Sequence, residues 1–222
     1  MRGLYKSGIK EEVTMPVIGV LALQGAFIEH VHKLQRIGAD AREIRLPDQL
    51  KQVDGLIIPG GESTTIGKLI DRFELREPIH ELASAGKPVW GTCAGMILLA
   101  REVDKETRAR SQPLLGLMDL SVTRNAFGSQ LDSFETDLSI PAVDSQPVHA
   151  VFIRAPVISS VGPSVEVLSS LEDGRVVAVR QGNLIATSFH PELTPDDRLH
   201  SWFAGLAHNH AEKESAFASS SS

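Results

Sequence analysis

The chain has 222 residues, 42% of them hydrophobic, and its 22 Lys and Arg against 28 Asp and Glu give a net charge of −6. Its single cysteine excludes an internal disulfide and a zinc site built from several cysteines. The acidic balance argues against a nucleic-acid binder, and no apolar run reaches the roughly 20 residues of a membrane-spanning helix.

The two ends of the chain are polar and have no periodic pattern. Residues 1–14 form an N-terminal extension and residues 211–222 a serine-rich tail, and we expect both to be disordered because they have little to bury. The N-terminus lacks the apolar core of a signal peptide, so we expect a cytoplasmic protein. Residues 15–210 contain no repeat and no linker, which predicts one domain.

The first half of the domain alternates short apolar segments with segments of helical spacing. Ile28, Val31, Leu34 and Ile37 recur at helical spacing between the first two apolar segments. Strands are predicted at residues 17–23, 41–46, 53–58 and 88–90. Buried strands that alternate with helices indicate a parallel sheet covered on both faces.

The second half is richer in strands and ends in a helix. Strands are predicted at residues 117–123, 148–153, 164–168, 175–180 and 184–189. Apolar residues at spacings of three and four between Leu199 and Leu206 predict a helix that packs on the sheet. We therefore expect an α/β fold, a three-layer α/β/α sandwich with a mostly parallel central sheet and extra antiparallel strands.

The lone cysteine lies in the pattern G-x-C-x-G, between a predicted strand and a predicted helix. This is the cysteine form of a nucleophile elbow, in which a sharp turn holds Cys93 at a helix N-terminus. The helix dipole favours a thiolate there, and the N–H of Ala94 can face an oxyanion. The alternative is a buried structural cysteine in a glycine-rich turn.

A nucleophilic cysteine needs a base, and one of the eight histidines is placed for this role. His190 follows an apolar strand in the segment F-H-P-E, where sites in α/β sheets collect, and Glu192 could orient it. The alternative is a loop histidine beside a surface glutamate. His30 and His200 lie in helical patterns, and we expect both on the surface.

A glycine-rich segment, PGGEST at residues 59–64, follows the third predicted strand. Its backbone N–H groups, Gly61 among them, can turn toward an anion, although a plain turn capped by Ser63 or Thr64 is the alternative. It is not a phosphate loop, because Glu62 stands where the first glycine of that motif belongs. The two H-x-H pairs of the chain make no convincing metal site.

These signals together resemble the triad glutamine amidotransferases, and within them the glutaminase subunits of pyridoxal 5′-phosphate synthase. The resemblance rests on the segments 19–25, 59–65, 91–96, 124–135, 152–156 and 187–194. It implies that Cys93 attacks the glutamine amide to form a γ-glutamyl thioester, that His190 is the base and then the acid, and that Glu192 orients His190. It implies no cofactor. We assign the chain to the hydrolases and, through the synthase, to the lyases.

The resemblance also implies how glutamine is held. Gly61 and Ala94 would form the oxyanion site, and the substrate-binding residues would be Gly61, Glu62, Ser63, Arg124, Ile153 and Arg154. The family usually has an arginine where this chain has Ser129, so a nearby contact is expected to differ. The polar stretch 102–112 is longer than is usual, and we expect a loop insertion without catalytic effect.

A partner is implied as well. The relatives dock on a (β/α)₈-barrel synthase that uses the ammonia, in complexes of up to twelve subunits of each kind. By analogy, Gln24 and Gly25 would face that synthase. The alternatives are a glutaminase for another synthase such as that of imidazole glycerol phosphate, a non-catalytic relative, and a freestanding hydrolase of γ-glutamyl peptides.

Overall fold

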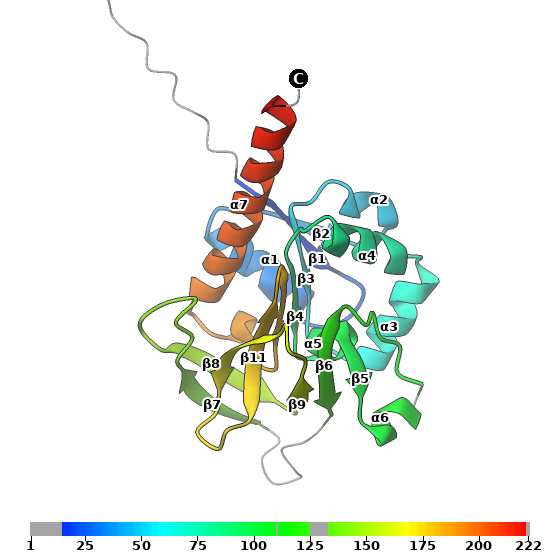
Figure 1. The fold of residues 1–222 in the computed structure, drawn as a ribbon, viewed down its shortest axis with the longest axis vertical. Helices are drawn as coiled ribbons and strands as arrows, with labels where there is room; N and C mark the ends of the chain where they lie inside the picture. Colours follow the sequence, from blue (N-terminus) through cyan, green and yellow to red (C-terminus); the bar gives the residue numbers. More distant parts are fainter. Residues whose placement is uncertain (1–14, 110, 125–132, 221–222) are drawn as a thin grey trace, which may run out of the picture.

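The computed structural model describes residues 15–109, 111–124 and 133–220, which form a large sheet flanked by helices (Figure 1). Within these residues the large sheet has ten strands in the order β2-β1-β3-β4-β12-β11-β9-β6-β5, with β10 paired to β11. A separate ribbon consists of β7 and β8. The predicted N-terminal extension, residues 1–14, lies outside the described residues.

The strands divide into a parallel group and an antiparallel group. Their bounds are β1 Val17–Leu21, β2 Asp40–Ile44, β3 Gly55–Ile58, β4 Val89–Thr92, β5 Ala100–Val103, β6 Met118–Thr123, β7 Ser133–Leu138, β8 Val148–Ile153, β9 Val157–Val161, β10 Glu166–Ser170, β11 Val176–Gln181 and β12 Leu184–Thr187. Strands β2, β1, β3, β4 and β12 are mutually parallel, as are β5 and β6. The pairs β12–β11, β11–β9, β9–β6 and β10–β11 are antiparallel.

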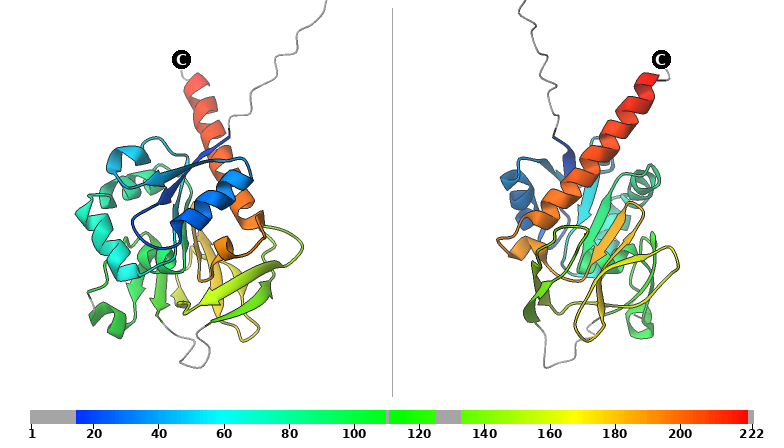
Figure 2. Two further views of the ribbon diagram at one scale, coloured as in Figure 1. Left: turned by 180° about the vertical axis from the view of Figure 1, so that it is seen from behind. Right: turned by 60° about the vertical axis from the view of Figure 1, so that its left-hand side comes forward.

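Helices cover both faces of the parallel group. Their bounds are α1 Phe27–Arg36, α2 Pro47–Leu50, α3 Ser63–Arg72, α4 Arg76–Ser84, α5 Ala94–Leu99, α6 Lys105–Ala109 and α7 Arg198–Ser220, with a 3₁₀ turn, η1, at Pro191–Leu193. Leu56 and Ile58 of β3 share one buried cluster with residues of α2 to α5. Ile57, on the opposite face, shares the other with residues of α1, α7 and the β7–β8 ribbon. The predicted three-layer sandwich is therefore confirmed, and Figure 2 shows α1 and α7 together on one side.

Two local expectations differ from the structure. The segment 211–220, expected to be disordered, continues α7 to Ser220 and projects from the body (Figures 1 and 2). Ala, Glu and Lys favour helices, and the buried start of α7 supplies the nucleus from which it extends. The stretch 102–112, expected to be a loop, contains the end of β5 and helix α6. None of the described helices is long and apolar enough to cross a bilayer.

Candidate active site

Three neighbouring parallel strands end at one edge of the sheet and carry the three segments that the sequence singled out. Gly60 and Gly61 follow β3, Cys93 follows β4, and His190 lies three residues beyond the end of β12. Since β3 pairs with β4 and β4 with β12, all in parallel, their carboxyl ends lie side by side. The strand order thus brings together segments that are far apart in the sequence.

The turn at Cys93 has a backbone conformation that few L-residues adopt. Cys93 has φ 49° and ψ −103°, and its N–H donates to the Thr187 carbonyl oxygen at 2.8 Å. Such a conformation costs about 1–3 kcal/mol and persists only when its surroundings enforce it. The next turn packs tightly, since a Cβ on Gly95 would lie 2.0 Å from the carbonyl oxygen of Ile58. Ala94 begins α5, so its N–H has no acceptor within the helix.

The imidazole of His190 lies between a thiol and a carboxylate. Its Nδ1–H donates to Glu192 Oε1 at 2.7 Å, which leaves Nε2 for the cysteine. Burial lowers the pKa of His190, but hydrogen bonds with Cys93 and Glu192 outweigh burial and raise this pKa to about 10. A charged imidazole beside a thiol is the arrangement in which a histidine activates a cysteine nucleophile.

Glu192 is a buried carboxylate, only 5% exposed. Burial raises its pKa, while the His30 and His190 rings outweigh burial and lower it below the ordinary value. Its Oε1 binds His190, whereas its Oε2 has no hydrogen bond of ordinary geometry and lies 3.3 Å from Nε2 of His30. An ionised carboxylate in this place keeps the imidazole in one orientation and tautomer.

The loop before α1 holds the glycine segment after β3. The N–H of Ala26 donates to the Gly60 carbonyl oxygen at 3.0 Å, and the N–H of Glu62 donates to Gln24 Oε1 at 2.8 Å. Because the peptide is trans, the N–H of Gly61 points to the side opposite the Gly60 carbonyl. Gly25 lies too close for any side chain, since a Cβ there would be 1.9 Å from that carbonyl oxygen.

The residues after the glycines begin α3, and the cap is Glu62 rather than Ser63 or Thr64. The Glu62 carboxylate accepts from the backbone N–H groups of Thr64 and Thr65 at 3.2 and 2.7 Å. Burial raises its pKa, but hydrogen bonds from Thr65 and Thr64 outweigh burial and lower it to about 2. Arg124 is close by, with Nη2 3.4 Å from Glu62 Oε1.

Gln112 is a neighbour of this segment that the sequence did not single out. Its Oε1 accepts from the Ser63 hydroxyl at 2.8 Å and from the Thr64 hydroxyl at 3.0 Å, and Arg124 Nη1 lies 3.5 Å from it. The stretch expected to be a loop insertion without catalytic effect therefore places a polar side chain beside the candidate site. No motif marks Gln112, so only the path of the chain reveals the contact.

Ile153 and Arg154 lie at the end of the β7–β8 ribbon. Ile153 is the last residue of β8, and Arg154 has φ 44° and is exposed. The ribbon reaches the triad through its backbone, because the N–H of His190 donates to the Val151 carbonyl oxygen at 2.8 Å. Ser129, where the family usually has an arginine, lies outside the described residues.

Two further histidines adjoin the site, and the expectation that they lie on the surface is wrong. His30 in α1 and His200 in α7 are both 0% exposed. Their rings are 2.9 Å apart, from His30 Nδ1 to His200 Nε2, and His30 Nε2 lies 3.3 Å from Thr92 Oγ1. His30 shares a helix face with the buried Leu34, four residues on, a spacing that is compatible with burial but does not predict it for a polar side chain.

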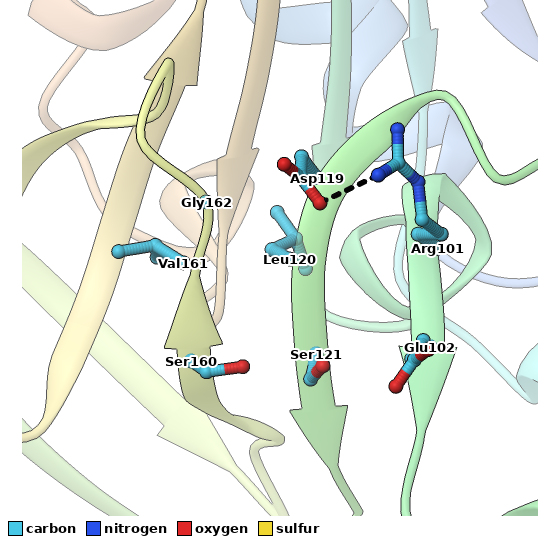
Figure 3. A pocket seen from close by; sticks show the side chains of 8 residues that line it. All are labelled: Arg101, Glu102, Asp119, Leu120, Ser121, Ser160, Val161 and Gly162. Carbon is cyan, nitrogen blue, oxygen red and sulfur yellow. Dashed lines mark hydrogen bonds and ion pairs between the residues drawn. The ribbon is translucent and has the colours of Figure 1, made fainter.

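A cavity of about 230 Å³ lies away from these residues, between β5, β6 and β9 (Figure 3). An ion pair of 2.8 Å between Arg101 and Asp119 borders it. The cavity is lined by Arg101, Glu102, Asp119, Leu120, Ser121, Ser160, Val161 and Gly162, none of which is a candidate site residue. Among the described residues no group of three His, Cys, Asp or Glu is arranged to hold a metal ion.

Known proteins resemble this chain over most of its length. A pyridoxal 5′-phosphate synthase subunit PdxT from Herpetosiphon aurantiacus is 63% identical over 85% of this chain and 99% of its own, and the PdxT of Moorella thermoacetica is 58% identical over 84% and 96%. A crystal structure of a glutamine amidotransferase matches with a TM-score of 0.80 and 47% identity, over 86% of this chain and 98% of that one. The structure of PurLQS from Thermotoga maritima shares the fold, with a TM-score of 0.62 at 16% identity over 90% and 99%.

These matches also correct one expectation. The assignment to the lyases is wrong, because the relatives support a glutaminase subunit, which splits an amide with water and is therefore a hydrolase. The model described as the SNO glutamine amidotransferase family matches residues 20–208, a range that includes Cys93, His190 and Glu192. This chain belongs to the SNO glutamine amidotransferase family.

Proposed function

We propose that this protein is the glutaminase subunit of a pyridoxal 5′-phosphate synthase. It hydrolyses L-glutamine to L-glutamate and ammonia and delivers the ammonia to a synthase subunit, as the name of its PdxT relatives suggests. The observation that carries the proposal is the cluster of Cys93, His190 and Glu192, in which His190 hydrogen-bonds to Glu192 and shares the backbone of Gly60 as a neighbour with Cys93. The glutaminase domain comprises residues 15–210.

In the proposed first step, the Cys93 thiolate attacks the side-chain amide carbon of glutamine. The N–H groups of Ala94 and Gly61 stabilise the negative charge that forms on the carbonyl oxygen. The tetrahedral intermediate collapses as the His190 imidazolium gives its proton to the departing nitrogen, which releases ammonia and leaves a γ-glutamyl thioester.

In the second step, water replaces ammonia. Neutral His190 takes a proton from the water as it attacks the thioester carbon, and the Cys93 thiolate leaves. The products are glutamate and the regenerated ion pair, so no cofactor is consumed. Glu192 stabilises the imidazolium whenever it forms, because its carboxylate accepts from Nδ1–H.

The substrate is held by groups around α3 and at the end of β8. We propose that the segment Gly61, Glu62 and Ser63 lines the glutamine site and that Arg124 pairs with the α-carboxylate of glutamine. Arg124 is 22% exposed at its side chain and borders Glu62, so it can face both solvent and ligand. Ile153 and Arg154 complete the site from the β8 side.

Free ammonia would be lost to water, so a glutaminase domain that feeds a synthase has to deliver the ammonia to it directly. We propose a (β/α)₈-barrel synthase subunit, in a complex of up to twelve copies of each chain. Gln24 and Gly25 would face it, and their contacts with Gly60 and Glu62 would couple docking to the oxyanion site. Gln24→Ala should weaken both docking and stimulation by the synthase, and unchanged values would refute this role. We place the reaction in the cytoplasm, where a catalytic thiol stays reduced.

Glutamate release measured with and without the synthase subunit tests the proposal. The wild type should be slow alone and faster with the synthase, whereas Cys93→Ala and His190→Ala should be inactive in both. His149→Ala is the matched control, since His149 lies on the ribbon bonded to Asp137 and Glu135 and should keep full activity. Turnover that survives Cys93→Ala, or that needs no synthase, would refute the proposal.

A further inference from the structure

Behind Glu192 lies a pair of buried histidines that the proposed mechanism does not use. His30 Nε2 is 3.3 Å from Glu192 Oε2, and His30 Nδ1 is 2.9 Å from His200 Nε2. Both rings are fully buried, and they come from different helices, α1 and α7. The pair therefore joins the outer helical layer to the carboxylate that orients His190.

Burial favours the neutral form of both histidines. Burial is the largest influence on each ring and lowers the pKa of His30 and of His200 below the ordinary value of 6.5. Other charged groups face them: the carboxylates of Glu192 and Glu29, the imidazole of His190 and the ammonium of Lys33 act on His30. A neutral imidazole has one N–H and one bare nitrogen, so a single proton must be placed on each ring.

The contacts favour one placement of these protons. If His200 donates from Nε2 to His30 Nδ1, the proton of His30 is on Nε2 and faces Oε2 of Glu192. In the opposite placement a bare nitrogen of His30 would face an ionised carboxylate, and two acceptors would repel each other. The N–H of His200 would then be on Nδ1, a buried atom with no hydrogen-bond partner, which is costly.

The surroundings fix both rings in this arrangement. Trp90 packs edge-on against them, with ring centroids 6.0 Å from His30 and 5.2 Å from His200. One turn further along α1, Lys33 donates to the carbonyl oxygens of Thr194 and, at 2.9 Å, Asp196. Helix α1 thus contacts the carboxylate of Glu192 and also the chain that follows it.

We propose that His30 is a positioning residue for the glutaminase reaction. It presents its Nε2–H to Oε2 of Glu192 at 3.3 Å, beside its contact with Thr92 Oγ1, and His200 fixes the tautomer that makes this possible. The carboxylate is then held at both oxygens, with Oε1 on His190. The inference rests on the proposed function, because its kinetic effect is read in glutamine hydrolysis.

Three variants test this role in the full-length chain together with its synthase. His30→Met removes the donor at similar volume, and we expect kcat to fall by about 10-fold to 100-fold, the range that a misplaced catalytic group can cost, with KM within twofold. His30→Gln keeps an N–H donor near the same place and should restore most of kcat. His32→Met is the matched control, because His32 is exposed on the same helix and should behave like the wild type.

A double-mutant cycle separates positioning from a structural role. In a Glu192→Gln background, His30→Met should change kcat less than twofold, because the carboxylate that it positions is gone. An equal loss in both backgrounds would show that His30 acts on the fold rather than through Glu192, and would overturn the inference. If the wild type shows no glutaminase activity at all, the result refutes the proposed function instead.

The tautomer can be read without any activity. Nitrogen-15 spectra of histidine-labelled protein, with His30→Gln used for assignment, should show His30 protonated at Nε2 and bare at Nδ1. His200→Phe should disturb this tautomer. A His30 ring protonated at Nδ1 would overturn the inference even if the enzyme is fully active.

Discussion

The backbone of Gly60 lies against the imidazole of His190. A Cβ on Gly60 would be 2.5 Å from Cε1 and 3.1 Å from Nδ1 of His190, distances at which the ring would have to move. The absence of a side chain at this one position therefore lets the imidazole reach both the thiol and the carboxylate of Glu192.

Gly60→Ala should consequently impair the chemistry more than the fold. We expect kcat to fall by about 100-fold, since a shift of about 1 Å in a catalytic group costs that much, while the thermal midpoint changes little. Gly205→Ala is the control, because Gly205 is exposed in α7 with no atom near its missing Cβ, and it should stabilise by about 0.4–1 kcal/mol. Normal kcat in Gly60→Ala would contradict the packing described here.

The pH dependence of activity should follow the hydrogen bond between His190 and Glu192. Burial lowers the pKa of His190, but hydrogen bonds with Cys93 and with Glu192 outweigh burial and raise this pKa from 6.5 to about 10, so the ring keeps its proton as the pH rises toward that value. Glu192→Gln removes the carboxylate, which lowers this pKa and moves the high-pH limb of kcat/KM to lower pH. The measurement is the profile of kcat/KM from neutral pH to above pH 10. If its high-pH limb lies at the same pH in Glu192→Gln as in the wild type, Glu192 does not stabilise the charged ring.

The cap at Glu62 should stabilise the fold in a pH-dependent way. Its folded pKa of about 2 lies below the ordinary 4.5, so its contribution is complete above pH 4.5 and is lost as the pH falls toward 2. Glu62→Ala should lower the free energy of unfolding by about 1 kcal/mol at pH 7, as the loss of a helix cap does, and Glu62→Asp by less. Denaturant titrations should show the gap between wild type and Glu62→Ala closing below pH 4.5, and a constant gap would speak against the cap.

Sequence patterns predicted the parallel core of the fold and the three segments at its edge, because both depend on residues that are close together in the sequence. Strand β3, for example, is an apolar run that ends at Pro59, and the elbow at Cys93 is a compact motif. Three strands of the second half, the parallel edge strand β5 and the antiparallel strands β7 and β9, were not predicted. Their sequences mix polar and apolar residues, and pairing with a distant strand decides their conformation.

The buried histidines were missed for a related physical reason. A polar side chain is expected on the protein surface unless a buried partner compensates for its lost hydration. The partners of His30 are Glu192 and His200, which are both distant from it in the sequence. The contact between Gln112 and Ser63 also joins residues that are distant in the sequence, so it depends on the path of the chain between α6 and β6. Tertiary partners of this kind leave no local pattern.

The projecting end of α7 should be dispensable. Residues 212–217 are exposed, and Phe217 is 76% exposed, so this segment buries little of its surface. Deleting residues 211–222 should leave both the thermal midpoint and glutaminase activity within error of the wild type. A clear loss of either would show that the helical end makes a contact that stabilises the domain.

The central claim is that Cys93 forms a covalent γ-glutamyl thioester, and intact-mass analysis of protein quenched in acid during turnover tests it most directly. With L-glutamine and the synthase subunit present, the account predicts a γ-glutamyl adduct on the peptide that contains Cys93, and none in Cys93→Ala. Because the chain has a single cysteine, no second thiol can give the same signal. Glutamine turnover by Cys93→Ala, or an adduct on another residue of the wild type, would contradict the account.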